Sequence, residues 1–168
     1  MPGNPGRQGA AVMSQSAWLW TTLLVLFGSA LQAQTSGPRF INPPGLTRPT
    51  GYTHVVLSAD GRTAYIAGQV AFDSLGKVVG AGNFPAQAAQ VFANLRRALE
   101  SVGASFKDVM KTTTFVTDAK NIPALRDTRA RYFDSLHPPA NTLIPVAALA
   151  RPDLLLEIEA VVDLPGGR

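Results

Sequence analysis

The sequence predicts an α+β domain in which two helices cover one face of a single mixed β-sheet. Three observations indicate this fold: alternating apolar runs that are typical of strands, two segments with apolar residues at helical spacing, and their order β-β-α-β-α-β-β. The chain has 168 residues, of which 46% are hydrophobic and 15% are charged. This composition suits one domain with a substantial core and excludes a disordered or fibrous chain.

The first two strands are expected at residues 53–58 and 63–67, where β-branched and aromatic residues gather. Asp60-Gly61 lies between them and is a strong hairpin signal, because glycine accepts a positive φ at little cost. A glycine-containing loop after Gly68-Gln69 then leads to the first helix.

The first helix is expected to begin after Asn83, with Pro85 near its first position, where a missing N–H does no harm. Gly103 is expected to cap its C-terminal end. The core-facing stripe consists of apolar residues three or four positions apart: Ala88, Val91, Phe92, Leu95, Leu99 and Val102.

The second half of the domain contains a strand at residues 109–116, a helix that begins after Asn121, and two final strands at residues 141–147 and 154–162. Pro138-Pro139 end this helix, because proline removes a backbone donor and clashes with the preceding turn. Its apolar stripe is expected to consist of Ile122, Leu125, Tyr132, Phe133 and Leu136.

The final strand places two carboxylates on one face, because side chains alternate along a strand. One face carries Leu156, Ile158, Ala160 and Val162, and the other carries Leu155, Glu157, Glu159 and Val161. A second sheet face that mixes apolar residues with carboxylates is typical of a subunit interface. A solvated sheet face is the alternative.

The N-terminal third differs from the rest of the chain. Arg7 precedes an uncharged, largely apolar run at residues 17–27, which is followed by small residues at 28–30 and then by Ala33. This pattern is typical of a secretory signal peptide, whereas a membrane span needs roughly 20 apolar residues. Cleavage is expected after Ala33, with Ala30 as the alternative. We therefore expect a signal peptide at residues 1–33, a proline-rich extended arm at 34–50 and the domain at 51–168.

The expected location is consequently periplasmic or secreted, without stable membrane association after cleavage. A retained N-terminal anchor is the alternative, since Leu31 is a poor fit at the position three residues before the cleavage site that follows Ala33.

The formal net charge of +4 comes from scattered basic residues, so no nucleic-acid partner is expected. The absence of cysteine excludes disulfides and thiolate nucleophiles, and two isolated histidines predict neither a metal site nor a cofactor.

Several motifs resemble the RidA/YjgF family of reactive-intermediate (enamine/imine) deaminases over about residues 51–162. They are His137-Pro138-Pro139-Ala140-Asn141, the segment Leu-Glu-Ile-Glu-Ala-Val-Val at 156–162, and Gly68-Gln69 with Asp118 upstream. The resemblance implies a chorismate-mutase-like fold and a homotrimer. It also implies a small-molecule ligand in clefts between neighbouring subunits.

The resemblance also implies which residues form the site. In family members active on imines, an Arg holds the substrate carboxylate and a Glu orients or activates the hydrolytic water. Glu157 matches that Glu, while Tyr52, Gly68 and Gln69 match substrate-binding positions.

Three further substrate-binding positions depart from the family pattern. Asn141 replaces the Arg, Arg126 stands where Asn is common, and Leu143 stands where a small or thiol residue often lies. A guanidinium binds a carboxylate through two parallel hydrogen bonds, whereas an amide is neutral, and loss of one partner of a buried charged pair costs about 2–5 kcal/mol. Arg126 either supplies the missing positive charge from another wall of the cleft or is a solvated residue on the helix surface.

The sequence therefore predicts a hydrolase of enamine or imine C=N bonds that releases ammonia, with specificity shifted by Asn141. The alternative is a non-catalytic trimer that binds a small ligand or acts like a chaperone. Ribonuclease activity, an older attribution in this family, has no support beyond a sequence pI of about 9.9.

Removal of residues 1–33 on export is the first testable prediction. Mass spectrometry of the protein from its native host should show a chain that begins at Gln34, because the basic, apolar and small-residue pattern matches a signal peptide. An intact Met1 or Met13 terminus in the cytosol would contradict this.

Overall fold

The computed structural model describes Met1, Gly3 and residues 37–164. Apart from Met1 and Gly3, the predicted signal peptide lies outside the described residues. The chain divides into two units, Met1–Gln34 and Thr35–Arg168, and the second contains the domain described below. Within the described residues, no helix has the length and apolar character needed to cross a membrane.

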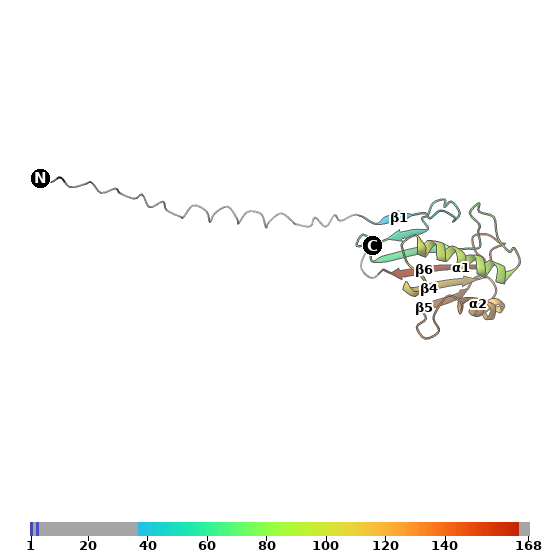
Figure 1. The fold of residues 1–168 in the computed structure, drawn as a ribbon. Helices are drawn as coiled ribbons and strands as arrows, with labels where there is room; N and C mark the ends of the chain where they lie inside the picture. The colour runs from blue at the N-terminus through green and yellow to red at the C-terminus, as the bar shows by residue number, and fades with distance from the viewer. Residues whose placement is uncertain (2, 4–36, 165–168) are drawn as a thin grey trace. The chain divides into compact units, whose positions relative to one another are not determined.

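The domain contains one six-stranded mixed sheet with the strand order β1-β2-β3-β6-β4-β5 (Figure 1). Only the β4 and β5 pair is parallel. The strands are β1 (Arg39–Ile41), β2 (Val55–Leu57), β3 (Thr63–Gln69), β4 (Val109–Val116), β5 (Ala140–Pro145) and β6 (Leu156–Asp163). The predicted fold class is confirmed.

Strand β1 is an addition to the predicted order, because it lies inside the segment predicted as an extended arm. It pairs antiparallel with β2, from Arg39 opposite Leu57 to Ile41 opposite Val55. The prolines Pro43 and Pro44 follow β1 rather than interrupt it, so the ladder keeps its backbone donors.

Helices α1 (Phe84–Glu100) and α2 (Ile122–Arg129) cover the same face of the sheet (Figure 1). Two short 3₁₀ turns, η1 (Phe106–Asp108) and η2 (Ala119–Asn121), precede β4 and α2. The predicted start of α1 is confirmed: the Asn83 side chain accepts a hydrogen bond from the backbone N–H of Ala86 at 3.0 Å. At its other end Gly103 has φ +71°, as the predicted cap requires.

The core lies between α1 and the sheet. All six residues of the predicted α1 stripe are buried. From the sheet they meet the alternate residues of β6, namely Leu156, Ile158, Ala160 and Val162, each at most 3% exposed. The predicted division into a core face and an opposite face is therefore confirmed for residues 156–162, but it is wrong for Leu155, which precedes β6 and packs against the core.

The second helix is shorter than predicted. It ends at Arg129, and Tyr132 and Phe133 reach the core from the following turn, where the Tyr132 ring stacks on Phe92 at 4.4 Å. The expectation for Leu136 is wrong, since its side chain is 80% exposed. The turn supplies the aromatic packing that a longer helix was expected to supply.

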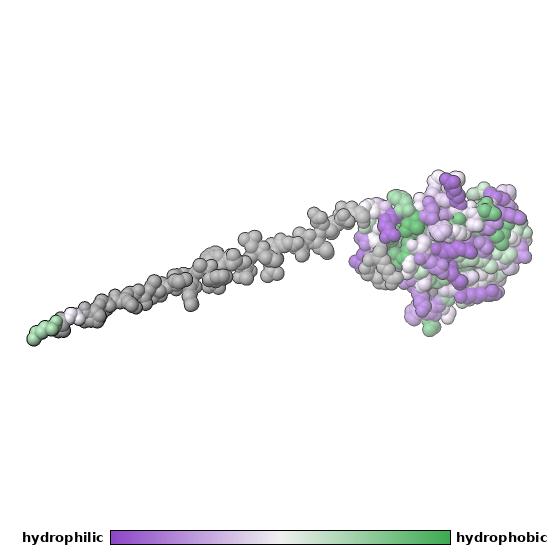
Figure 2. All heavy atoms as spheres, turned by 45° about the horizontal axis from the view of Figure 1, so that its top comes forward, coloured by the Kyte–Doolittle hydropathy of each residue, from purple (hydrophilic) through white to green (hydrophobic). Residues whose placement is uncertain are grey.

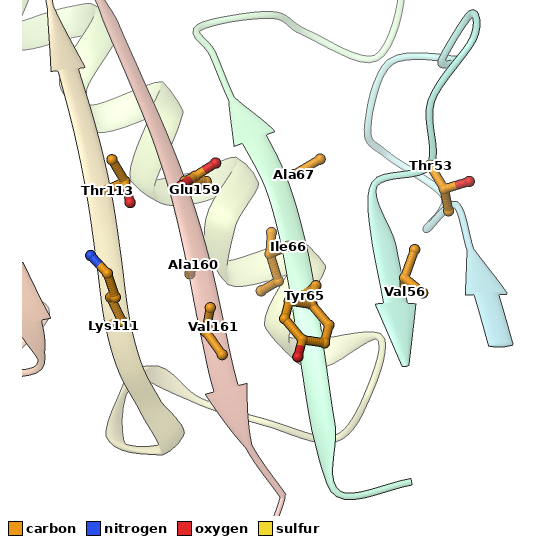
Figure 3. A pocket seen from close by; sticks show the side chains of 10 residues that line it. All are labelled: Thr53, Val56, Tyr65, Ile66, Ala67, Lys111, Thr113, Glu159, Ala160 and Val161. Carbon is orange, nitrogen blue, oxygen red and sulfur yellow. The ribbon is translucent and has the colours of Figure 1, made fainter. Parts of the chain in front are cut away.

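No helix of residues 37–164 lies on the opposite face of the sheet, and we call it the open face. Cross-strand neighbours share a face, so Phe40, Val56, Tyr65 and Val161 form an apolar row across β1, β2, β3 and β6. Phe40 is 69% exposed and Tyr65 is 55% exposed. Figure 3 looks onto this face and shows Tyr65 and Val161 side by side.

Figure 2 shows the surface of the domain from another side, turned by 45° from the view of Figure 1. Hydrophilic and hydrophobic residues are mixed on this surface.

Candidate functional site

Gly68 and Glu157 approach each other at the end of β3. The pairing of β3 with β6 shifts register between Ile66 and Gln69, so this part of β3 is irregular. A Cβ on Gly68 would overlap the carboxylate of Glu157. Gly68 and Gln69 are the last two residues of β3, and a side chain at position 68 would displace the Glu157 carboxylate.

The electrostatic environment of Glu157 favours retention of its proton. Burial raises the pKa of the Glu157 carboxyl, and the neighbouring negative charge of Glu159 raises it further. Burial, followed by the charge of Glu157, also raises the pKa of Tyr52. Tyr52 is therefore close enough to the Glu157 carboxylate for the two groups to interact electrostatically. These three predicted site residues, Tyr52, Gly68 and Glu157, therefore form one group in the single chain.

A buried polar network lies beside this group. The His54 ring is 3% exposed; its Nε2 donates to the backbone carbonyl of Thr47 at 2.8 Å, so its Nδ1 accepts from the Gln69 amide at 3.3 Å. The same amide donates to the Ala67 carbonyl at 2.9 Å. Because Gln69 is 2% exposed and its amide is engaged, it supports the chain around Gly68 instead of facing a ligand. The rings of His54 and Tyr52 form a T-shaped pair with their centroids 5.2 Å apart.

Asn141 lies in β5, on the other face of the sheet. Its side-chain oxygen accepts hydrogen bonds from the hydroxyls of Thr112 at 2.9 Å and Thr114 at 3.2 Å. Both threonines are buried on the helix-covered side of β4, while Asn141 itself is exposed. The register confirms the placement, since Asn141 pairs with Thr112.

The two remaining predicted residues lie on the same side of the sheet as Asn141. Leu143 is partly buried and packs against the core, opposite Thr114. Arg126 is exposed on α2 and lines a hollow of about 270 Å³ together with Arg129 and Phe133.

The predicted site therefore falls into two groups in one chain. The carboxylate group consists of Tyr52, Gly68 and Glu157, with Glu157 on the open face. The amide group consists of Arg126, Asn141 and Leu143, on the helix-covered side at the β5 edge. Strand β4 separates Glu157 from β5, because Phe115 pairs with both Glu157 and Ile144.

A separate hollow of about 290 Å³ lies on the open face (Figure 3). Its lining includes Tyr65, Ala67, Lys111, Glu159 and Val161. The described residues contain no group of three or more His, Cys, Asp or Glu side chains arranged to hold a metal ion. Apolar residues of the row and the polar side chains of Lys111 and Glu159 thus line the same hollow.

Sequence reasoning missed the supporting roles of His54, Thr112 and Thr114. The alternation of Thr112 and Thr114 with Thr113 and Phe115 was a signal for the two hydroxyls, because it places them on one face of β4. Nothing comparable marked His54, whose partners Thr47 and Gln69 are brought to it by the fold.

The raised pKa of Glu157 predicts a pH-dependent effect of Glu157→Gln on stability. A carboxyl whose pKa is raised by folding contributes stability below its unfolded pKa and loses that contribution as the pH rises through the folded value. Glu157→Gln should therefore increase the free energy of unfolding at pH 7, and the gain should vanish below about pH 4.

Urea unfolding at a fixed protein concentration measures this difference, with Glu100→Gln on exposed α1 surface as the control for loss of one negative charge. A gain that persists unchanged at low pH would contradict desolvation of Glu157.

Comparison with known proteins is consistent with this geometry. The family model described as endoribonuclease L-PSP matches residues 46–164. A RutC family protein of Synechocystis is 36% identical over 118 residues, which cover 70% of this chain and 89% of that protein. A 2-iminobutanoate/2-iminopropanoate deaminase of Dermatophagoides farinae is 30% identical over 128 residues, which cover 76% of this chain and 97% of the deaminase.

Among solved structures, this chain is similar to a putative endoribonuclease of Thermotoga maritima, with a TM-score of 0.70 and 32% sequence identity. The matched region covers 76% of this chain and 98% of the Thermotoga chain. The family match extends over most of the sheet and both helices, and it includes Glu157 and Asn141. The chain belongs to the RidA/YjgF family, whose family model carries the description endoribonuclease L-PSP.

Proposed function

We propose that this protein hydrolyses enamine or imine C=N bonds and releases ammonia. The observation that carries the proposal is the partly desolvated Glu157 carboxylate, packed on the backbone of Gly68 and coupled to Tyr52. The named activity of the Dermatophagoides relative, an iminobutanoate and iminopropanoate deaminase, supports this reaction class.

Hydrolysis of an imine needs a water oriented toward an electrophilic carbon and a group that exchanges protons. A carboxylate whose pKa is raised toward the working pH serves both purposes, because general acid–base catalysis is most efficient when the pKa lies near that pH. In the proposed mechanism Glu157 takes a proton from the attacking water and passes it to the imine nitrogen, which gives a carbinolamine. Glu157 then takes the hydroxyl proton of the carbinolamine and passes it to the amino group, so the C–N bond breaks, ammonia leaves and the carbonyl forms.

The two groups of site residues support assembly of the site between copies. Glu157 and Asn141 face opposite sides of one sheet, so no single chain brings them together around one small molecule. In our proposal the carboxylate group of one copy meets the amide group of the next. Proteins of this family are generally homotrimers, which is consistent with self-association.

The open face supplies the surface for this assembly. Its row of Phe40, Val56, Tyr65 and Val161 exposes large apolar side chains in the single chain. Apolar surface of this kind is stabilised by contact with a second copy. Both helices occupy the other face, so the open face is where copies meet in the proposed trimer.

A non-catalytic ligand-binding trimer is the second candidate, and Asn141 favours it. The proposed site has an amide in place of the guanidinium that holds carboxylate substrates in related imine deaminases. Measurement of ammonia release from a panel of acidic and neutral imines, with protein that begins at Gln34, separates the two candidates: release above the uncatalysed rate supports the hydrolase.

Substitutions at Glu157 and Asn141 test the mechanism. Glu157→Ala should abolish ammonia release, because it removes the group that orients the water. Asn141→Arg should increase catalytic efficiency on 2-imino acids roughly thirty-fold, equivalent to about 2 kcal/mol for a regained charge pair. Asn141→Gln, which adds length without charge, is the matched control and should give no such increase.

Full activity of the Glu157→Ala variant would rule out the proposed mechanism. Efficient hydrolysis of imino acids by the unmodified protein would show that another cation already holds the carboxylate, and Arg126→Gln would then identify it.

The trimer is tested with Val161→Asp, which places a charge at the β6 end of the apolar row. We expect light scattering to give three times the mass of one chain for the unmodified domain and a smaller mass for the variant. The matched control is Leu136→Asp, since Leu136 is an apolar residue that is 80% exposed outside the open face. A stable monomer of the unmodified domain at micromolar concentration would contradict the assembly.

A further inference from the structure

The side-chain amide of Asn141 is held in one orientation by two buried hydroxyls. Thr112 and Thr114 are 1% and 3% exposed, and each donates its hydroxyl proton to the Asn141 oxygen. They lie two residues apart on β4 and so face the same side as Asn141. Among the described residues, neither hydroxyl makes another hydrogen bond.

The opposite amide orientation is disfavoured by the same two hydroxyls. If the NH₂ group pointed toward β4, both threonine protons would lose their acceptor inside a buried site. A buried donor without a partner costs about 1–3 kcal/mol. The oxygen of Asn141 is therefore directed into the protein, and both of its lone pairs are occupied.

Two N–H donors of Asn141 remain directed away from β4. Asn141 is exposed, and its NH₂ group has no protein partner within the part of the chain that the structure describes. An asparagine is normally both donor and acceptor. In this setting Asn141 offers an incoming ligand hydrogen-bond donors only, and it offers them without a charge.

The surrounding cations are engaged elsewhere or lie in another hollow. Lys111 donates to Thr142, a residue on the open face, at 2.9 Å. The Arg129 guanidinium lies over the Phe133 ring at 4.7 Å and donates to the backbone carbonyl of Pro139, two residues before Asn141, at 3.5 Å. Arg126 lines the hollow with Arg129 and Phe133, whose lining does not include Asn141. Among the described residues, therefore, no Lys or Arg side chain is hydrogen-bonded to the Asn141 amide, and the guanidinium of Arg129 is held by the Pro139 carbonyl and the Phe133 ring.

We propose that Asn141, oriented by Thr112 and Thr114, selects substrates that carry an uncharged hydrogen-bond acceptor, an amide or ester carbonyl, where related deaminases take a carboxylate. This inference rests on the proposed function, because it assigns Asn141 to the substrate cleft. A carbonyl oxygen accepts from the two N–H groups without the desolvation cost of an uncompensated carboxylate. Thr112 and Thr114 act as positioning residues.

The test compares two probes with the same carbon skeleton, 2-oxobutanamide and 2-oxobutanoate. Their dissociation constants are measured by NMR titration of the assembled domain, through the backbone amide signals of β5 and, where Asn141 is present, through its side-chain NH₂ signals. We expect the amide to bind about ten-fold more tightly than the acid, a difference of about 1.4 kcal/mol. Equal or tighter binding of the acid overturns the proposal, and so does the absence of any shift with both probes.

Two sets of variants separate orientation from simple contact. Asn141→Leu is close in size but has neither an N–H donor nor a charge, so it should lose the amide preference completely. The double variant Thr112→Val, Thr114→Val releases the side-chain amide and should reduce the preference below about three-fold, while Thr113→Val on the opposite face of β4 should leave it unchanged. Retention of the full preference in Asn141→Leu overturns the donor role.

Failure of this inference is distinguishable from failure of the proposed function, because binding is measured without turnover. Amide preference without ammonia release would support the specificity of the site and count against the hydrolase. Ammonia release together with tighter binding of the carboxylate probe would support the hydrolase and count against the proposed specificity.

Discussion

Strand β6 fixes both the core and the reactive group, because its residues alternate between two different environments. It lies between β3 and β4, and hydrogen-bonded ladders on both sides hold its backbone. Its inward residues are buried under the helices, and burial of a Leu or Ile side chain stabilises a fold by about 1.5–3 kcal/mol. Glu157 and Glu159 project from the other side of the same rigid strand. Their positions are therefore set by the core, and a site built on such a strand is held more accurately than one on a loop.

The chemistry of Glu157 follows from what approaches it on this strand. The irregular pairing at the end of β3 brings Gly68 against the carboxylate, and any side chain at that position would displace the carboxylate. Burial and the like charge of Glu159 then raise the pKa of Glu157. Because the amide of Asn141 lies across β4 and on the other face, the chain separates a water-activating group from a donor group. Assembly of copies is what would complete a cleft from these two parts.

Much of the fold could be predicted from local patterns, whereas the site could be predicted only in part. Alternation in β6 and helical spacing in α1 identify their buried faces, because burial imposes those periods on the sequence. The end of α2 could not be predicted, since Tyr132 and Phe133 reach the core from a turn that has no periodic signal. Strand β1 could not be predicted, because the prolines on either side of it are typical of an extended segment outside a sheet. The motif match named Asn141 and Glu157 but gave no information on which face each occupies, because that depends on the register between β4, β5 and β6.

The central claim is that one site is formed by two copies, and the absence of cysteine from the chain permits a direct measurement. Tyr52→Cys and Asn141→Cys are placed on separately tagged chains, which are co-expressed and treated with a short bis-maleimide. The account predicts a covalent link between differently tagged chains, and covalent trimers when both cysteines are on every chain. The matched control, Tyr52→Cys with Leu136→Cys, should link far less. Linkage of Tyr52→Cys to Asn141→Cys within a single chain, without covalent dimers or trimers, would contradict the account.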